Sequence, residues 1–187
     1  MARTGANDWV EAGIALLREE GHASLRIDDL CRRLGRTKGS FYHHFPSFGA
    51  FRDTLLARWE TDLTEHPIAH ADLEPDPELH PAQLSEAVRG LDHRLDLAIR
   101  SWALRDAHVR EALDRVDERR VGFLAELWAE RTGRRATAML LARLDYAAFV
   151  GAQQLYPDLS AADVCGLEDS LAKALRLLAE SLAAPAK

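Results

Sequence analysis

Residues 27 to 45 read Ile-Asp-Asp-Leu-Cys-Arg-Arg-Leu-Gly-Arg-Thr-Lys-Gly-Ser-Phe-Tyr-His-His-Phe, and this stretch decides the fold. Its first half carries apolar residues at 27, 30, 31 and 34, the spacing that gives a short helix one apolar stripe. Gly35 ends that helix, and the hydroxyl of Thr37 can cap the first turn of a second one. The second helix ends before Pro46, because a residue before proline is disfavoured in the α conformation. The pattern predicts a helix-turn-helix motif.

The second helix of this motif has two chemically different sides. Phe41 and Phe45 form an apolar inner side, whereas the polar side chains can donate hydrogen bonds to phosphates or to base edges in a major groove. Lys38 either reads a guanine or only neutralises a phosphate, and Arg26 either reaches a phosphate or is merely solvated. The alternative is a two-helix corner that never touches DNA. We predict that DNA is contacted by Arg26, Arg36, Thr37, Lys38, Gly39, Ser40, Tyr42 and His43.

The run Leu34-Gly-Arg-Thr-Lys-Gly-Ser-Phe-Tyr-His-His-Phe45 resembles the DNA-binding domain of the TetR family of transcriptional regulators, and the resemblance covers roughly residues 9 to 60. It implies an all-helical fold in which three N-terminal helices bind DNA. A larger, variable C-terminal helical domain then dimerises and usually binds a small effector. The resemblance also implies a lysine contact to the DNA backbone at the start of the next helix. This sequence has Ser47-Phe48-Gly49 there, and Arg52 is only a weak substitute.

We therefore predict an all-α protein with three parts. Residues 1–47 form a three-helix helix-turn-helix DNA-binding domain, residues 48–65 a connecting helix, and residues 66–187 a helical domain for effector binding and dimerisation. Four prolines in 66–81 predict a non-helical connection. Its histidines, His66, His70 and His80, suggest a metal site, but Pro67 disturbs the helical spacing, so we expect a solvated acidic loop and no metal or other cofactor. Amphipathic helices are expected at 8–20, 47–63, 83–105 with a break near its end, 108–131, 137–156 and 160–182.

Charge is distributed unevenly along the chain of 187 residues, whose formal net charge is −6. Residues 1–60 contain nine Lys and Arg against eight Asp and Glu, whereas the remainder has fifteen against twenty-two. Positive charge is densest between Arg26 and Arg58, with seven basic and three acidic residues, as expected for a DNA-binding segment. Hydrophobic residues make up 47%, which excludes a disordered chain.

Other classes of protein are disfavoured by what the sequence lacks. Cys31 and Cys165 are too few for a disulfide framework. Neither a signal peptide nor a long uncharged apolar run is present, so we expect a cytoplasmic protein without a membrane partner. His43 and His44 have no adjacent acid or nucleophile, so we expect no catalytic residues and no enzyme.

Aromatic and polar residues of the C-terminal helices are candidates for an effector pocket. Arg120 falls on an apolar stripe four residues after Val116, where a guanidinium needs a partner. It binds an effector carboxylate, or it pairs internally or extends to solvent. The candidate pocket residues are Trp59, Trp102, Arg120, Trp128, Tyr146, Phe149 and Gln153.

The last two helices are candidates for a dimer interface. The helix 137–156 is apolar on nearly every side, which indicates that a second subunit covers one of them. Packing inside an ordinary monomer core is the alternative. The interface candidates are Ala147, Ala148, Gly151, Leu171, Leu175 and Leu178.

The hypothesis for function is a homodimeric, ligand-responsive transcriptional repressor on a palindromic operator in double-stranded DNA, with an unknown small-molecule effector. The alternative is a helical dimerisation or interaction protein that has lost specific DNA binding. The acidic total charge and the absence of lysine at Phe48 favour this alternative.

Overall fold

The computed structural model describes residues 4–156 and 160–183, which form helices and no strand. By its contacts the chain divides into two units, with residues 1–69 and 86–116 in unit 1 and residues 70–85 and 117–187 in unit 2. Three helices, α5 (His66–Asp72), α6 (His80–Arg89) and α8 (Ala107–Thr132), contribute residues to both units. The predicted all-α fold is confirmed. The predicted functional boundaries at residues 47 and 65 remain predictions.

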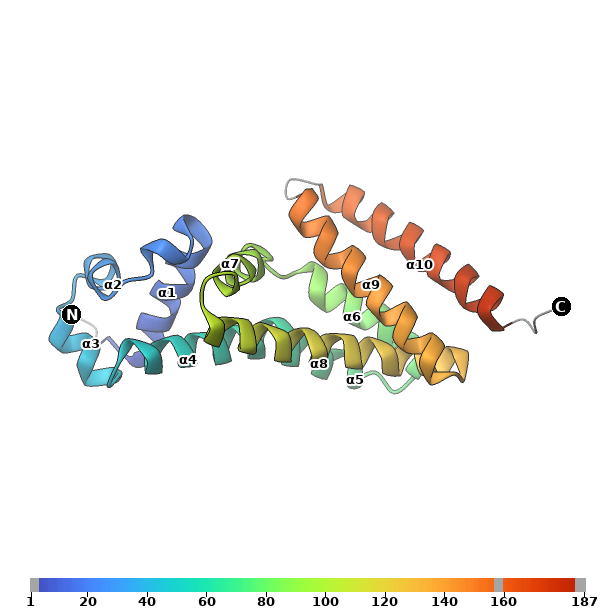
Figure 1. The fold of residues 1–187 in the computed structure, drawn as a ribbon, viewed down its shortest axis with the longest axis horizontal. Helices are drawn as coiled ribbons and strands as arrows, with labels where there is room; N and C mark the ends of the chain where they lie inside the picture. Colours follow the sequence, from blue (N-terminus) through green and yellow to red (C-terminus); the bar gives the residue numbers. More distant parts are fainter. Residues whose placement is uncertain (1–3, 157–159, 184–187) are drawn as a thin grey trace. The chain divides into compact units, whose positions relative to one another are not determined.

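Unit 1 contains the predicted helix-turn-helix and the helices that support it. Its elements are α1 (Ala6–Glu20), the 3₁₀ turn η1 (His22–Ser24), α2 (Ile27–Leu34), α3 (Lys38–His44), α4 (Phe48–Glu60) and α7 (Arg94–Ala103). Helix α1 packs against α2, α4 and α7 (Figure 1). Trp9, Phe41 and Phe51 are fully buried between these helices. The Phe41 ring lies 5.4 Å from Trp9 and 5.5 Å from Phe51, both in edge-on contacts that favour a fixed arrangement of the helices.

The predicted non-helical connection at 66–81 is wrong over much of its length. Helix α4 continues through a π-helical turn, η2 (Thr61–Glu65), directly into α5 (His66–Asp72). The amide of His66 donates to the carbonyl of Thr61, five residues earlier. A proline inside an α-helix loses one hydrogen bond and clashes with the carbonyl four residues before it. We attribute the tolerance of Pro67 to the wider π turn that precedes it. A 3₁₀ turn, η3 (Pro77–Leu79), then leads into α6 (His80–Arg89).

The single helix predicted at 83–105 is also wrong, because α6 and α7 are separate helices. The chain turns between Gly90 and His93, far from the expected break near the end. Asp92 Oδ1 accepts a hydrogen bond from the amide of Arg94 at 3.1 Å, which begins α7. The apolar spacing of the sequence continues across this turn, and periodicity alone therefore did not reveal it.

Unit 2 is built mainly from the second part of α8 with α9 (Arg135–Leu155) and α10 (Ala161–Ala183). All three agree with the predicted helices. Ser160 caps α10, because its hydroxyl oxygen accepts from the amide of Asp163 at 3.2 Å. The core consists of Trp128, Ala138, Leu141, Ala142 and Leu175.

The described residues contain neither a membrane-spanning helix nor a cluster of metal-ligating side chains. None of their helices has the length and apolar composition required to cross a bilayer. Within residues 4–156 and 160–183, no group of three or more His, Cys, Asp or Glu side chains is placed to hold a metal ion.

Candidate nucleic-acid interface and ligand-binding region

Helix α3 is held rigidly on one side and exposed on the other. Gly35 adopts a left-handed conformation with φ of 62°, which a glycine accepts without strain and which ends α2. Thr37 caps α3, since its Oγ1 accepts from the amide of Ser40 at 3.4 Å. Phe41 and Phe45 are 0% and 4% exposed, so the inner side predicted from the sequence is confirmed. The outer side of α3 is therefore presented by a fixed backbone.

The eight predicted DNA contacts come from the start of α2, the turn and α3. Among them Ser40 and Arg36 are half-buried, and the other six are exposed. Arg36 Nε donates to Thr4 Oγ1 at 2.7 Å, which ties the turn to the segment before α1. Their contacts to DNA remain predictions: Arg26, Arg36, Thr37, Lys38, Gly39, Ser40, Tyr42 and His43.

Lys38 has a partner that the sequence analysis missed. Its Nζ lies 2.8 Å from Oδ1 and 3.0 Å from Oδ2 of Asp28, across the turn between α2 and α3. This hydrogen bond raises the pKa of Lys38 and keeps the ammonium group charged. The two residues are ten apart in sequence, so only the angle between the two helices brings them together.

The start of α4 lacks the cation implied by the family resemblance. Phe48 is half-buried and packs with its ring 5.9 Å from that of Phe51. Arg52 NH1 donates to Asp106 Oδ2 at 3.2 Å, which directs the guanidinium toward the start of α8. This ion pair weakens the case for Arg52 as a substitute phosphate contact.

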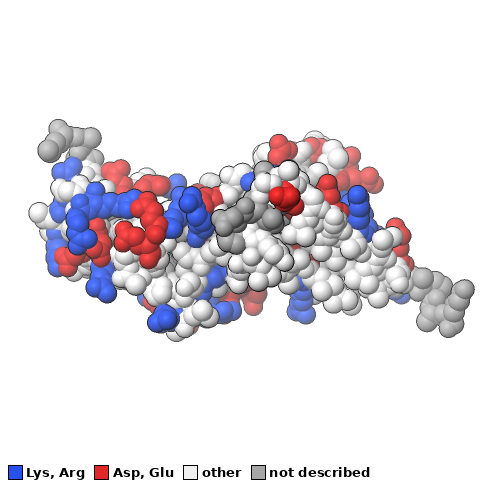
Figure 2. Space-filling view, turned by 90° about the horizontal axis from the view of Figure 1, so that it is seen from above, with Lys and Arg blue, Asp and Glu red and all other residues white. Residues whose placement is uncertain are grey.

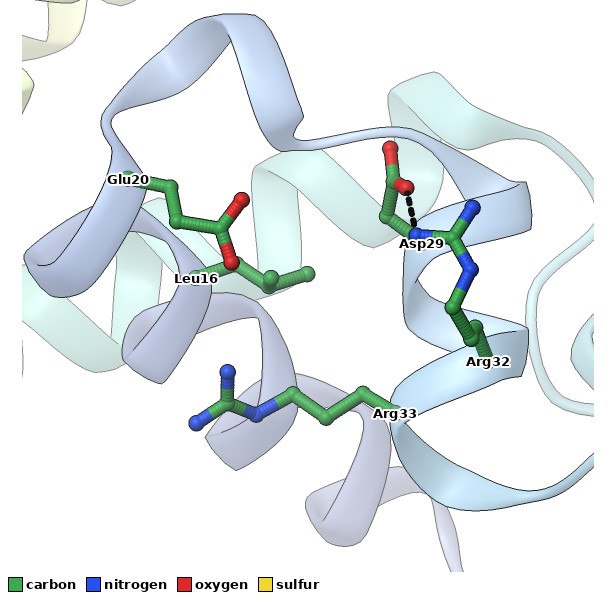
Figure 3. Close-up of a pocket in the computed structure, with 5 residues that line it drawn as sticks. All are labelled: Leu16, Glu20, Asp29, Arg32 and Arg33. Carbon is green, nitrogen blue, oxygen red and sulfur yellow. Dashed lines mark hydrogen bonds and ion pairs between the residues drawn. The ribbon is translucent and has the colours of Figure 1, made fainter.

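Basic side chains at this end of the molecule are interspersed with acidic ones (Figure 2). A hollow of about 210 Å³ lies between α1 and α2 and is lined by Leu16, Glu20, Asp29, Arg32 and Arg33 (Figure 3). Arg32 NH1 donates to Asp29 at 2.7 Å, and Arg33 donates twice to Glu19, also at 2.7 Å. The hydrogen bonds from Arg33 lower the pKa of Glu19. Because both guanidinium groups are paired with carboxylates, this hollow is not suited to an anion.

The seven predicted pocket residues fall into two sets. Trp59 and Trp102 belong to the hydrophobic core of unit 1, where they are 0% and 6% exposed. The other five belong to unit 2: Arg120, Trp128, Tyr146, Phe149 and Gln153. The seven residues therefore do not form one pocket within a single unit. The role of each residue in ligand binding remains a prediction.

Polar side chains connect α8 and α9 inside unit 2. Tyr146 donates its phenolic hydrogen to Asp117 Oδ1 at 2.6 Å and accepts from Arg120 NH1 at 3.1 Å. Arg120 therefore has an internal partner, one of the two alternatives considered for it. Trp128 Nε1 donates to Asp145 Oδ2 at 3.3 Å, and burial raises the pKa of Asp145. The sequence analysis missed both carboxylates, because acids within amphipathic helices normally face solvent.

A hollow of about 400 Å³ lies beside this network in unit 2. It is lined by Asp117, Glu118, Val121, Gly122, Met139 and Arg143. The side-chain amide of Gln153 is buried on α9 with no hydrogen-bond partner among the described residues. The charged side chains of Asp117, Glu118 and Arg143 therefore line the hollow, whereas Gln153 is not among its lining residues.

Helices α9 and α10 pack against each other and both carry exposed leucines, and we name their exposed side the α9–α10 surface. Leu175 is only 5% exposed and belongs to the core of the unit, and Leu171 packs against that core. Ala147 is exposed and Ala148 and Gly151 are half-buried. The face that carries these helices is largely uncharged (Figure 2). The exposed leucines that define the surface are Leu140, Leu144, Leu167, Leu177, Leu178 and Leu182.

The chain combines a capped helix-turn-helix, which packs on other helices of unit 1, with a second helical unit. This architecture is typical of helix-turn-helix regulatory proteins. Residues 10–47 match the family model of bacterial regulatory proteins, tetR family. The HTH-type transcriptional regulator CymR of Pseudomonas putida is 30% identical over 126 residues, which are 64% of this chain and 61% of that protein. The chain thus spans about 61% of the length of this curated relative. Residues 10–47 of this chain are therefore similar to the DNA-binding part of TetR-type regulators.

Solved structures show that the fold extends over most of the chain. A TetR/AcrR family regulator has a TM-score of 0.70 at 18% identity, covering 92% of this chain and 95% of that one. The reduced form of Escherichia coli NemR has a TM-score of 0.67 at 18% identity, covering 90% and 95%. An Aquifex aeolicus TetR-type regulator has a TM-score of 0.66 at 16% identity, covering 92% and 98%. The family model that matches residues 10–47 describes bacterial regulatory proteins.

Proposed function

We propose that this chain is a cytoplasmic, sequence-specific DNA-binding regulator of transcription, and most specifically a repressor. The observation that carries the proposal is helix α3. Its inner side is fixed by Phe41 and Phe45, and its first turn is capped by Thr37. Its exposed side presents Lys38, Tyr42 and His43, which are suited to phosphate and base contacts. A reading helix must be rigid and exposed in this way, because base readout depends on a fixed position in the groove.

The regulator acts as a homodimer in this proposal. The α9–α10 surface supports it, because exposed leucines such as Leu144 and Leu178 lie on neighbouring helices and are 42% and 36% exposed. Exposed leucines gathered on two neighbouring helices are typical of an interface between subunits. The two copies of α3 would then enter successive major grooves about 34 Å apart, and the operator would be a palindrome.

A small molecule controls binding in this proposal. The hollow beside Asp117 and the network through Tyr146 and Arg120 offer polar groups for a ligand in unit 2. A ligand that binds better to the form unable to bind DNA lowers DNA affinity, and linkage makes the effect reciprocal. Titration of the tryptophan fluorescence of the operator-bound protein with a panel of metabolites tests this part. A panel without any response in fluorescence or operator release would remove the support for a ligand.

The decisive experiment is selection of bound fragments from genomic DNA at 50 mM and 200 mM salt, followed by sequencing. We expect one palindromic sequence to survive the higher salt, because base contacts add to the salt-sensitive phosphate contacts. Recovery of unrelated fragments that vanish at the higher salt would instead favour an interaction protein that has lost specific DNA binding. The half-buried Phe48 in place of a cation is the observation that favours this second candidate.

A further inference from the structure

The ion pair between Asp28 and Lys38 lies on the surface that carries the proposed DNA contacts. Lys38 is the first residue of α3, and Asp28 is the second residue of α2. Their side chains are 59% and 65% exposed, so neither residue is needed for the core. Residues in the first turn of a recognition helix are those that reach base edges in helix-turn-helix proteins. The ion pair therefore lies where the DNA phosphates and bases would approach the protein in the proposed complex.

The positive ends of the two helices stabilise Asp28 at its position and destabilise Lys38 at its position. A carboxylate in the first turn of α2 is stabilised by the positive end of that helix, which favours Asp28 where it is. An ammonium group in the first turn of α3 is disfavoured by the same effect, so Lys38 depends on Asp28 to remain against the protein. Asp28 also places a negative charge where phosphates must approach. Both effects reduce the attraction of this surface for DNA of any sequence.

We propose that Asp28 is a specificity-determining residue of this regulator. Its carboxylate holds the Lys38 ammonium group and withholds that charge from phosphates. Lys38 is released only where the operator offers an acceptor better than a phosphate, such as guanine O6 and N7. Asp28 thereby weakens binding to random DNA more than binding to the operator. This inference rests on the proposed DNA-binding function and assigns a new role within the same surface.

The test is the variant Asp28→Asn, which keeps the size of the side chain and removes its charge. Binding to random-sequence DNA and to the selected operator is measured over a range of salt concentrations. We expect roughly fivefold or greater tightening on random DNA at 0.1 M salt, because each released lysine neutralises one more phosphate. The plot of log affinity against log salt should steepen by about 0.9 for each bound subunit. The ratio of operator to random affinity should fall.

Asp29→Asn is the matched control, because it makes the same charge change one residue along the same helix. Asp29 pairs with Arg32 at 2.7 Å beside the hollow between α1 and α2 (Figure 3). Any general effect of added positive charge, or of a lost acid in the first turn, will appear in this variant as well. Far-UV circular dichroism and a thermal melt of both variants check that α2 is intact.

A second variant links the effect to Lys38. In the double variant Asp28→Asn with Lys38→Met, the tightening on random DNA and the steeper salt dependence should both disappear. If Asp28→Asn binds random DNA no more tightly than Asp29→Asn, the proposal is wrong. It is also wrong if Asp28→Asn weakens the operator alone, because Asp28 would then be a base contact. Failure of the proposed function is a separate result, since the wild-type protein would then prefer no sequence over random DNA.

Discussion

The indole N–H of Trp59 on α4 donates to the buried carboxylate of Asp96 on α7, with 3.1 Å between Nε1 and Oδ1. Arg100 Nε binds the other oxygen of Asp96 at 3.0 Å. Asp96 is only 2% exposed, so its carboxyl group depends on hydrogen-bond partners within the protein. This arrangement ties α4 to α7 inside unit 1, and α4 directly follows the helix-turn-helix.

Asp96→Ala should therefore lower the free energy of unfolding by about 3–5 kcal/mol, because it removes a buried carboxylate that accepts from both the Arg100 guanidinium and the Trp59 indole. Urea unfolding followed by tryptophan fluorescence measures the loss. Asp114→Ala is the control, since Asp114 pairs with Arg110 at the same helical spacing but is exposed, and its loss should cost less than about 1 kcal/mol. Equal losses of unfolding free energy in the two variants would show that the buried ion pair stabilises the protein no more than the exposed one.

Glycines at two helix positions should respond to alanine in opposite directions. A Cβ atom at Gly13 would lie 2.7 Å from Phe51 Cζ and 2.8 Å from Leu55 Cδ1, so Gly13→Ala should destabilise unit 1 by about 1–3 kcal/mol. Gly122 on α8 has nothing within 4 Å of such an atom, so Gly122→Ala should stabilise the protein by about 0.5–1 kcal/mol. Thermal melts of both variants measure the signs. A neutral Gly13→Ala would mean that α1 and α4 can separate without cost.

The buried carboxylate of Asp145 should make stability depend on pH. Burial raises its pKa above the ordinary value of 3.8, so the folded protein holds a proton that the unfolded chain releases. The contribution of Asp145 to the free energy of unfolding is most favourable below pH 3.8. This contribution is lost as the pH rises through the raised pKa of the folded protein. Asp145→Asn should therefore stabilise the protein at pH 7 by an amount on the order of 1 kcal/mol.

Urea midpoints of wild type and Asp145→Asn between pH 4 and pH 7 check this prediction. Asparagine keeps an oxygen acceptor for the Trp128 indole, so the variant isolates the charge. The difference between the two proteins should shrink as the pH falls. A difference that stays constant with pH would contradict a raised pKa at Asp145.

The α9–α10 surface should be required for dimer formation. Leu178→Glu places a charge on each side of the proposed interface, and the dimer dissociation constant should rise on the order of a hundredfold. Sedimentation velocity over a concentration series measures it. Leu104→Glu, at an 80% exposed leucine of unit 1, should leave the dimer unchanged. A wild-type protein that sediments as a monomer at all concentrations would remove this part of the proposal.

Tyr42 should contribute to DNA affinity without contributing to sequence preference. Its hydroxyl is expected to bind a phosphate, so Tyr42→Phe should weaken operator and random DNA alike by about tenfold. Tyr156→Phe, at an exposed tyrosine of unit 2, is the matched control and should have no effect. Fluorescence anisotropy with labelled duplexes measures both. A changed base preference at one position would show that Tyr42 reads a base instead.

The helix-turn-helix was predictable from sequence because its signals are local. The stripe from Ile27 to Leu34, the stop at Gly35 and the cap at Thr37 each extend over eight residues or fewer, and all three agree with the structure. The family resemblance rests on the same local string of residues.

The features that the sequence analysis missed depend on contacts between residues that are distant in sequence or on backbone geometry that residue types do not specify. Pro67 was interpreted as a helix breaker, because a π turn before it cannot be recognised from residue types. The turn after Gly90 was missed since the apolar spacing continues across it. Asp28, Asp96 and Asp145 all occur at ordinary polar positions of helices, and only the packing of a second helix gives each its partner.

Unit 1 is discontinuous in sequence, since residues 86–116 belong to it as much as residues 1–69 do. The surface that carries the proposed DNA contacts therefore cannot be grafted onto another regulator as a simple N-terminal piece. A chimaera joined after residue 47 or 65 would separate α1 from α7, and a join after 65 would also separate Trp59 from Asp96. An exchange of DNA specificity between relatives needs three junctions, near residues 69 and 86 and within α8. Recombination in evolution faces the same restriction, so new specificities in this protein should arise by point substitutions in α2 and α3.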